Sequence, residues 1–452
     1  MNEDLLDSAP DLDESTEGAR DANVDVSFQV TFTHRLRQTH DVAGRDFRVL
    51  ESVLSIDQPT PPKVLFFVDS NLVGDPNLGK ENAALVSNQD IRPIRSSTDT
   101  STTPSPSHQL AGEQRLSGEQ RLFGDRLWER LQRSSAVNLC GTMQVIPGGE
   151  VAKHHEQTLR QMLDQIHEHG LDRRSVIVVA GGGAVLDAAG FAAAIAHRGI
   201  RLVRLPSTTL AQADSGVGVK NAINYYRKKN WIGTFAVPWA VINDTKILET
   251  LPDRDFRCGL TEAVKVALLK DQRFFEMLSR DAAAMARRRQ PACAEAIARS
   301  CRLHLDHITL GGDPFEALQA RPLDFGHWSA HRLEPMTGFR LRHGEAVGIG
   351  VALDTLYSVR KFGLTESAAD TVFQTLSDLG APLWCDDVAN ADVLLTGLEE
   401  FRQHLGGELT VTMLRDVGEP FEVHEIDHDV MRQCIDQLQK VAVRRNATVR
   451  LG

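Results

Sequence analysis

The sequence predicts an α/β domain with a parallel sheet, followed by a mostly helical (all-α) domain. Strand-like and helix-like segments alternate between about residues 26 and 250, a pattern typical of parallel strands with helices on both faces of the sheet. Beyond about residue 251 the strand signals nearly vanish and helical periodicity dominates. We therefore expect an α/β domain over 26–250 and a helical domain over 251–452, with a ligand bound in the cleft between them.

Length and composition describe an ordinary globular protein. The chain has 452 residues, of which 42% are hydrophobic and 25% charged, enough for two domains with sizeable cores. No apolar run approaches the roughly 18 residues of a membrane span, and the N-terminus lacks the basic and apolar regions of a signal peptide. We expect a cytoplasmic protein without a membrane partner. Its six scattered cysteines form no C-x-x-C pair, which favours reduced thiols.

The acidic charge is concentrated at the N-terminus. The net charge is −11, and residues 1–25 hold nine acidic side chains and one arginine, so we expect a disordered tail there. The rest of the chain is near neutral and has no basic stripe, which argues against a nucleic-acid partner. Residues 75–125 contain SSTDTSTTPSPS and a repeated GEQRL, which indicate a low-complexity insertion in the first domain.

The elements of the first domain follow in order along the chain. We expect strands over 24–33, 63–68, 145–146, 175–180, 200–205 and 240–243, and helices over 153–169 and 184–197. Asp69 and Asn71 follow the second of these strands. The strand at 175–180 runs into Gly181, Gly182 and Gly183 before a helix, a layout that lets backbone N–H groups approach a pyrophosphate. The spacing is not G-x-G-x-x-G, so a tight turn without a ligand remains an alternative.

A polar stretch over residues 206–233 joins the two halves. It contains several glycines together with Asp214, Lys220, Lys229 and Asn230, a combination that suits a loop binding anionic groups. A solvated basic loop is the alternative, although it would not require Asp214 beside the Ser-Gly-Val-Gly spacer.

The second domain contains the densest group of candidate metal ligands. We expect helices over 253–270, 280–305, 344–362 and 366–379. If the chain is helical from Trp328 onward, His327 and His331 lie one turn apart on the same face, with His343 close by in the sequence. A catalytic metal needs a further, distant ligand, and the best candidate is Glu262, which shares a helix face with Lys265. Ordinary packed histidines are the alternative interpretation.

Several runs together resemble one enzyme family. GGGAVLDAAGFAAAIAHRGIRLVRLPSTTLAQADSGVGVKNAIN, KKNWIGTF, TLPDRDFRCGLTEAVKVALLKD, DFGHWSAH and HGEAVGIG are similar, in this order, to the sugar phosphate cyclases typified by 3-dehydroquinate synthase. The resemblance extends over about residues 63–441 apart from the insertion. It implies a dehydroquinate synthase-like fold, with an NAD-binding domain followed by a metal- and substrate-binding domain. It also implies a lyase that closes a carbocycle with loss of phosphate.

The resemblance assigns roles to individual residues. It implies a zinc or cobalt ion held by Glu262, His327 and His343. It implies that NAD contacts Asp69, Asn71, Glu150, Lys153, Gly182, Gly183, Asp187, Thr208, Lys229 and Thr250. Substrate contacts correspond to Asp214, Lys220, Asn230, Lys265 and His331. Arg198 matches an arginine that reaches the phosphate of the neighbouring subunit, which implies a homodimer.

Departures from the dehydroquinate synthase pattern R-x-x-x-N-x-G-H bear on the substrate. Asp324 replaces the asparagine, and Ala320 stands at the arginine position with Arg321 beside it. An aspartate disfavours a substrate carboxylate but accepts hydrogen bonds from hydroxyls. We therefore expect sedoheptulose 7-phosphate, as in the valiolone-type cyclases. Lys440 and Arg321 keep the seven-carbon acid phosphate of 3-dehydroquinate synthase as an alternative. A metal-dependent polyol dehydrogenase and an inactive scaffold protein are the further alternatives.

Overall fold

The computed structural model describes residues 25–57, 59–74, 122–154, 156–226, 228–311, 314–315, 323–404 and 407–449. Most of the expected acidic tail and of the expected insertion lies outside these residues, as do Ala320 and Arg321. The chain divides into two compact units, residues 1–33 and residues 34–452. The α/β elements and the helical elements described below both belong to the second unit.

A seven-stranded parallel sheet forms the centre of the α/β part. Its strand order is β1-β9-β6-β5-β2-β3, and β4 pairs with the end of β2. The strands are β1 (Leu36–Thr39), β2 (Lys63–Asp69), β3 (Asn138–Leu139), β4 (Gln144–Ile146), β5 (Val176–Gly181), β6 (Arg201–Pro206) and β9 (Ala240–Asp244). Because the strands are parallel, their carboxyl ends meet at one edge of the sheet, where ligands bind in open α/β folds.

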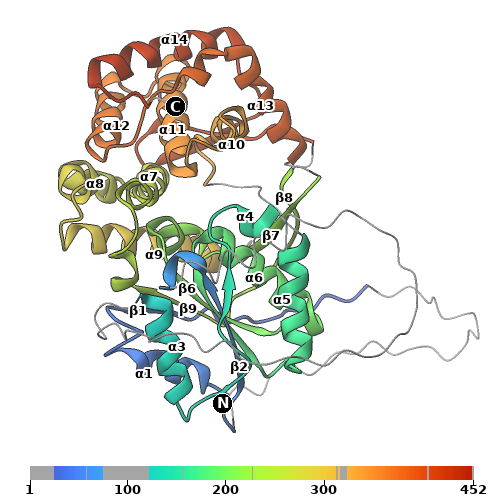
Figure 1. Ribbon diagram of the computed structural model, residues 1–452. Helices are drawn as coiled ribbons and strands as arrows, with labels where there is room; N and C mark the ends of the chain where they lie inside the picture. Colours follow the sequence, from blue (N-terminus) through green and yellow to red (C-terminus); the bar gives the residue numbers. More distant parts are fainter. Residues whose placement is uncertain are drawn as a thin grey trace, which may run out of the picture. The chain divides into compact units, whose positions relative to one another are not determined.

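Both faces of the sheet are buried. Along β2, Phe66 points into a core shared with α1 (Phe47–Leu54) and α3 (Phe123–Arg133), whereas Phe67 points into a core shared with α5 (Glu156–Glu168) and α6 (Gly183–Ile195). Figure 1 shows these two helix pairs on opposite sides of the strands. Each fully buried phenylalanine contributes about 1.5–3 kcal/mol of hydrophobic stabilisation. The two-sided burial explains why these strands are continuous apolar runs in the sequence.

The helical part begins nine residues after the last strand of the sheet. Its helices are α7 (Asp253–Lys270), α8 (Gln272–Met285), α9 (Ala292–Leu310), α10 (His327–Met336), α11 (His343–Phe362), α12 (Glu366–Asp378), α13 (Ala391–His404) and α14 (His428–Arg445). A two-stranded sheet, β10 (Val411–Asp416) and β11 (Glu419–Val423), packs among them. The predicted order of a parallel α/β part followed by a mostly helical part is confirmed.

Three predictions about local structure are wrong. Residues 25–33 form no strand, and Val26 and Phe28 are 75% and 84% exposed, so their apolar alternation has no buried face. The helix expected over 280–305 is two helices, α8 and α9, because Pro291 at the start of α9 cannot continue a helix. The polar stretch 206–233 is not only a loop, because it contains a hairpin of β7 (Lys220–Tyr225) and β8 (Lys228–Phe235).

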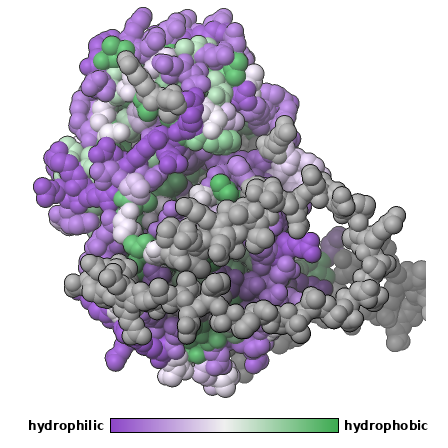
Figure 2. All heavy atoms as spheres, viewed as in Figure 1, coloured by the Kyte–Doolittle hydropathy of each residue, from purple (hydrophilic) through white to green (hydrophobic). Residues whose placement is uncertain are grey.

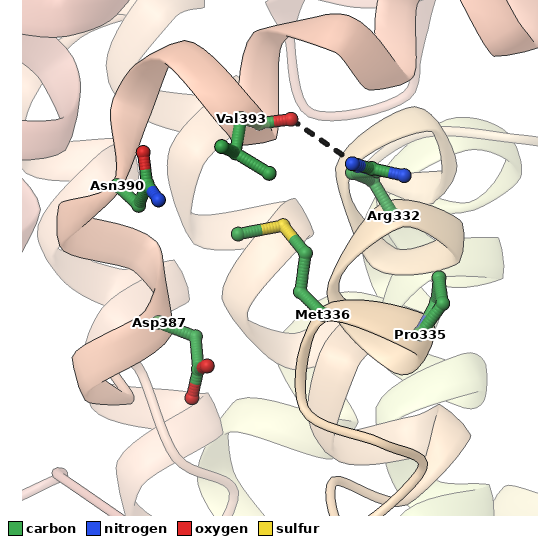
Figure 3. Close-up of a pocket in the computed structure, with 6 residues that line it drawn as sticks. All are labelled: Arg332, Pro335, Met336, Asp387, Asn390 and Val393. Atoms are coloured by element: carbon green, nitrogen blue, oxygen red, sulfur yellow. Dashed lines mark hydrogen bonds between the residues drawn. The ribbon is translucent and has the colours of Figure 1, made fainter.

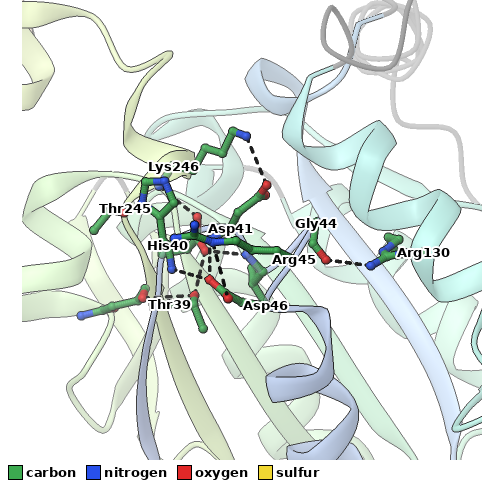
Figure 4. Close-up of polar contacts among 12 residues, drawn as sticks. Thr39, His40, Asp41, Gly44, Arg45, Asp46, Arg130, Thr245 and Lys246 are labelled. Atoms are coloured by element: carbon green, nitrogen blue, oxygen red, sulfur yellow. Dashed lines mark hydrogen bonds and ion pairs between the residues drawn. The ribbon is translucent and has the colours of Figure 1, made fainter.

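Polar contacts fix the end of the first strand of the sheet. Asp41, just after β1, pairs with Arg126 at 2.6 Å and Lys246 at 3.1 Å, while Asp46 accepts hydrogen bonds from the backbone of His40 and Asp41 (Figure 4). Hydrophilic residues cover most of the coloured surface seen in Figure 2. Among the described helices, none combines the length and the apolar character needed to cross a bilayer.

Candidate active site

Three helices bring Glu262, His327 and His343 together. Glu262 lies in the middle of α7, and the two histidines are the first residues of α10 and α11. The Nε2 atoms of His343 and His327 lie 3.3 Å and 3.7 Å from Oε1 of Glu262. One ligand atom from each of the three side chains falls within 4.8 Å of the others.

Close helix packing produces this convergence. Gly326, directly before His327, has a φ of +78°, and an added Cβ there would lie 2.4 Å from the backbone nitrogen of Val351 in α11. Gly344, directly after His343, approaches α7 so closely that a Cβ would lie 2.3 Å from the carbonyl oxygen of Cys258. Only glycine allows these approaches, so α10 and α7 both lie directly against α11.

Hydrogen bonds between the helices fix the three donors. The Thr261 hydroxyl, next to Glu262, donates to the carbonyl of Gly344 at 2.8 Å. The buried carboxyl of Asp354 in α11 accepts from the Gly326 N–H and the Trp328 indole N–H, both at 2.9 Å and on either side of His327. Each candidate ligand therefore has a neighbour in the chain that is tied to another helix.

Burial and neighbouring charges shift the pKa values of the cluster. Burial alone would raise the pKa of Glu262, which is 0% exposed, but Lys265 and then His327 hold it well below its usual value. Burial and the charge of Lys265 lower the pKa of His327 to about 4. Burial would lower the pKa of His343, but Glu334 and Glu262 raise it to about 9.

The donor set fits a divalent metal. Both carboxylate oxygens of Glu262 are buried, and neither accepts a hydrogen bond of normal geometry from the described residues. Nδ1 of His327 lies 3.3 Å from the carbonyl of Phe325, and Nδ1 of His343 lies 3.3 Å from Oε2 of Glu334. With Nδ1 engaged in each ring, both Nε2 atoms are available on the side of Glu262. One carboxylate oxygen and two imidazole nitrogens form a common catalytic zinc set that leaves a position open.

Lys265, His331 and Asp324 surround this cluster. Nζ of Lys265 lies 2.7 Å from Oε2 of Glu262, so Oε1 faces the two histidines and Oε2 faces the ammonium group. Burial would lower the pKa of Lys265, but Glu262, Asp214 and Asp324 raise it to about 12. The ring of His331 lies 5.4 Å from that of His327 and 6.0 Å from that of His343 between centroids.

The comparisons with known proteins bear on this arrangement. The 3-dehydroquinate synthase N-terminal profile matches residues 143–258, and the 3-dehydroquinate synthase C-terminal profile matches residues 259–400. A 3-dehydroquinate synthase from Azotobacter vinelandii is 35% identical over 328 residues, which are 72% of this chain and 88% of that protein. The chain belongs to the 3-dehydroquinate synthase family. This confirms the predicted membership of the sugar phosphate cyclases, which are enzymes that eliminate phosphate.

Solved structures of sugar phosphate cyclases share the fold of this family member. ValA, a 2-epi-5-epi-valiolone synthase from Streptomyces hygroscopicus subsp. jinggangensis 5008 with NAD+ and Zn2+ bound, has a TM-score of 0.73 at 23% identity, covering 92% of this chain and 99% of its own. A 2-deoxy-scyllo-inosose synthase with carbaglucose-6-phosphate, NAD+ and Co2+ has a TM-score of 0.64 at 22% identity, covering 89% and 96%. These likenesses confirm the predicted dehydroquinate synthase-like fold.

Several of the expected NAD contacts of this dehydroquinate synthase relative lie at the carboxyl edge of the sheet. Asp69 ends β2 and accepts hydrogen bonds from the backbone and side-chain nitrogens of Asn71, at 2.9 Å and 2.8 Å. Burial raises the pKa of Asp69, while Asn71 and the backbone of Gly182 oppose the rise. Gly182 caps α6 and lies against Thr208, whose side chain a Cβ on Gly182 would approach to 3.3 Å.

Two further cofactor candidates form an ion pair beside this edge. Nζ of Lys153 in α4 (Val151–His154) lies 2.7 Å from Oδ2 of Asp187, which is in the second turn of α6. Gly183 begins α6, and a Cβ there would lie 2.8 Å from Oγ of Ser215, so the polar segment after β6 packs against the glycine turn. The glycine turn and the polar segment therefore line the same edge.

Sequence reasoning missed two side chains in this part of the molecule. Nδ1 of His304 in α9 lies 2.6 Å from Oδ1 of Asp214, and both side chains are mostly buried. Burial would raise the pKa of Asp214, but His304 and then Lys265 lower it to about 2. Glu334 in α10 is 6% exposed at its side chain and contacts both His343 and Lys229. The sequence could have indicated Glu334 by its position seven residues after His327, because this spacing places the two residues on the same helical face.

The remaining predicted residues lie farther from these contacts. Lys220 is exposed at the start of β7, and Asn230 in β8 has a φ of +55° and donates its backbone N–H to Asn224. Arg198 and Thr250 are exposed. Lys440 is exposed on α14.

A separate pocket lies beside α10, on the side away from the histidines. It has a volume of about 300 Å³ and is lined by Arg332, Pro335, Met336, Asp387, Asn390 and Val393 (Figure 3). Arg332 donates to the carbonyl of Val393 across it. Residues 332 and 336 lie on the face of an ideal helix opposite residues 327 and 334, so most of this pocket faces away from the candidate metal cluster.

Proposed function

We propose that this chain is an NAD- and divalent metal-dependent cyclase that converts a seven-carbon sugar phosphate to a carbocycle with loss of phosphate. The observation that carries the proposal is the convergence of Glu262, His327 and His343, with Lys265 against Oε2 of the glutamate. In this proposal the three side chains hold zinc or cobalt, the ions present in the two solved relatives. Lys265, His331, Asp214, Lys220 and Asn230 contact the substrate.

The carboxyl edge of the sheet is proposed to hold NAD. Asp69 is a buried acceptor at the end of β2, in the place where a ribose is held in α/β folds. The Gly181–Gly183 turn presents the N-terminus of α6 to a pyrophosphate. Asn71, Glu150, Lys153, Asp187, Thr208, Lys229 and Thr250 complete the proposed cofactor site.

The roles of the chain's own groups follow from their charges. When bound, a metal would supply a Lewis acid for the oxygen at the reacting carbon, and NAD would supply a reversible hydride acceptor. Lys265 keeps Oε2 of Glu262 neutralised and leaves Oε1 for the metal. The basic side chains orient the phosphate before it leaves, and the ionised Asp214 accepts hydrogen bonds from substrate hydroxyls.

Two seven-carbon substrates are candidates, each supported by one observation. The curated relatives compared are 34–37% identical and are named 3-dehydroquinate synthase, which favours the acid phosphate of that enzyme. Asp324 raises the pKa of both Lys265 and His327, so its carboxylate lies close to the cluster, where it would repel a substrate carboxylate. This second observation favours sedoheptulose 7-phosphate. We rank the acid phosphate first, because the sequence identity to the 3-dehydroquinate synthases extends over most of the chain.

The proposed active form is a homodimer. Arg198 is exposed, with a left-handed φ of +62°, at the end of η2 (Ala196–Arg198). An arginine in this position is free to reach a phosphate in a neighbouring subunit, as the family resemblance implies. Sedimentation of the purified protein tests this part of the proposal, because a monomer that turns over substrate would contradict it.

The decisive experiment supplies the two substrates separately. The purified chain is incubated with NAD, zinc or cobalt, and either sedoheptulose 7-phosphate or the acid phosphate, and released phosphate and the mass of the product are measured. Phosphate release from one substrate with no net NADH supports the proposal and chooses the substrate. Net NADH formation from a polyol without phosphate release would instead indicate a polyol dehydrogenase. His343→Ala is expected to abolish turnover with the fold retained.

A further inference from the structure

Glu334 connects the candidate metal cluster to the hairpin that carries part of the proposed cofactor site. It lies on α10 and shares a helix face with His327 and His331. Its Oε2 lies 3.3 Å from Nδ1 of His343, and its Oε1 accepts a hydrogen bond of 2.9 Å from Nζ of Lys229. The two oxygens thus bind two different parts of the molecule.

On one side, Glu334 fixes the orientation of His343. Its carboxylate engages Nδ1, so Nε2 faces Oε1 of Glu262 at 3.3 Å. A carboxylate that accepts the second N–H of a ligating histidine sets the tautomer and the ring orientation, and loss of such a partner typically costs about 10–100-fold in metal affinity. The buried position of Glu334, with 6% of its side chain exposed, strengthens this contact because little water competes for it.

On the other side, Glu334 holds β8 through Lys229. None of the eight residues of β8 is fully buried, and its apolar packing comes from Ile232, which lies against the core that contains Ile223 of β7. A second polar connection comes from Asn224 in β7, which donates to Glu150 at 2.8 Å and accepts from the backbone of Asn230 at 2.8 Å. β8 is paired with β7, which buries Asn221, Ala222 and Ile223. A two-stranded hairpin has marginal stability by itself, so the polar contacts of Lys229 and Asn230 add to the anchoring of its exposed end.

We propose that Glu334 is a positioning residue that couples metal binding at His343 to the placement of the β7–β8 hairpin and hence to NAD affinity. This inference rests on the proposed metal and NAD sites. A metal that fixes His343 also fixes Glu334, which then restricts Lys229 before the cofactor arrives. When the metal has already ordered the hairpin, NAD binding loses less conformational entropy. Each ligand therefore increases the affinity for the other by the same factor.

The test measures two affinities in wild-type protein and in Glu334→Gln. The Kd of Zn2+ is measured by competition with a chelator, and the Kd of NAD by calorimetry in Zn2+-loaded and metal-free protein. We expect Zn2+ to lower the Kd of wild type for NAD by about 5-fold or more, within the usual range of coupling. In Glu334→Gln we expect a Zn2+ affinity about 10–100-fold lower and no effect of Zn2+ on the Kd for NAD.

Lys229→Met provides a second variant that breaks the same connection without changing a candidate metal ligand. Because Lys229 is itself a proposed NAD contact, the affinity for NAD should fall both with and without Zn2+. Most of the Zn2+ affinity should be retained, and the effect of Zn2+ on the Kd for NAD should be lost. Glu400→Gln is the matched control, because Glu400 pairs with Arg332 of the same helix α10 at 2.8 Å on the side away from the histidines. It should retain both affinities and their coupling.

Amide hydrogen exchange gives a readout that does not depend on turnover. In wild type, Zn2+ alone should slow exchange in residues 228–235, and in Glu334→Gln it should not. If wild type binds both ligands and the coupling factor is unchanged in Glu334→Gln, the role of Glu334 is refuted while the proposed function stands. If wild type binds neither Zn2+ nor NAD, the proposed function itself fails.

Discussion

The buried carboxyl of Asp354 makes stability depend on pH in a way that one substitution can isolate. Asp354 is 0% exposed in α11 and accepts hydrogen bonds from Gly326 and Trp328. Burial raises its pKa from 3.8 to about 7, despite these two donors. A carboxyl with a raised pKa contributes stability that is complete below its unfolded pKa and lost as the pH rises through its folded pKa.

The expected size follows from the shift. A change of one pKa unit corresponds to about 1.36 kcal/mol, so ionising Asp354 in the folded protein costs about 4 kcal/mol between pH 4 and pH 7. Asparagine does not ionise, so Asp354→Asn should avoid this loss. It leaves one of the two N–H donors without its acceptor, which costs about 1–3 kcal/mol at every pH. As the pH rises from 4 to 7, the free energy of unfolding of wild type should therefore fall relative to that of Asp354→Asn.

Urea unfolding at a series of pH values measures this difference. Both proteins are studied in chelator and without NAD, and the free energy of unfolding is extrapolated to water at each pH. Asp427→Asn is the control, because its exposed carboxyl caps α14 and has a lowered pKa, so the difference in stability between this variant and wild type should stay constant between pH 4 and pH 8 and shrink only at more acid pH. Parallel stability curves for wild type and Asp354→Asn between pH 4 and pH 8 would refute the reasoning.

Three further predictions concern charges around the cluster. Lys265→Met removes the lysine cation paired with the buried Glu262, so it should destabilise metal-free protein by about 3–5 kcal/mol. Saturating Zn2+ should restore most of this stability, and an equal loss with and without Zn2+ would contradict the pairing. Asp324→Asn should shift the ratio of kcat/KM at least about tenfold, or 1.4 kcal/mol, towards the acid phosphate; an unchanged ratio would place Asp324 away from the substrate. Alanine substitutions of His304 and Asp214, alone and together, should give a coupling energy of about 1.5–3 kcal/mol in urea unfolding, and a value near zero would mean that the two side chains do not interact.

The sequence predicted the elements whose signals are local. The strands of the sheet are continuous apolar runs because helices cover both faces. This pattern predicted strands at 63–68 and 175–180, which the structure places at 63–69 and 176–181. The helix over Asp253–Lys270 was predicted to the residue. The glycine turn at 181–183 was likewise visible as a strand followed by a helix.

The failures came from features that depend on distant parts of the chain. Strand β8 of the β7–β8 hairpin has no buried residue, so the sequence of this strand lacks the apolar alternation that predicts a strand. The Asp214–His304 pair joins residues 90 positions apart, and no spacing rule connects them. Glu334 was missed for a different reason, because a glutamate on a helix is usually solvated and only the packing of α10 buries it.

The glycines beside His327 and His343 connect the packing of the helices to the chemistry of the site. In the sequence these glycines accompany a candidate metal site, but in the structure each one permits a close approach to another helix. Glutamate and histidine side chains from three helices reach a common point only if the helices lie this close. The convergence of the three donors therefore requires close packing of α7 and α10 against α11. A larger residue at Gly326 or Gly344 would separate these donors without changing any of them.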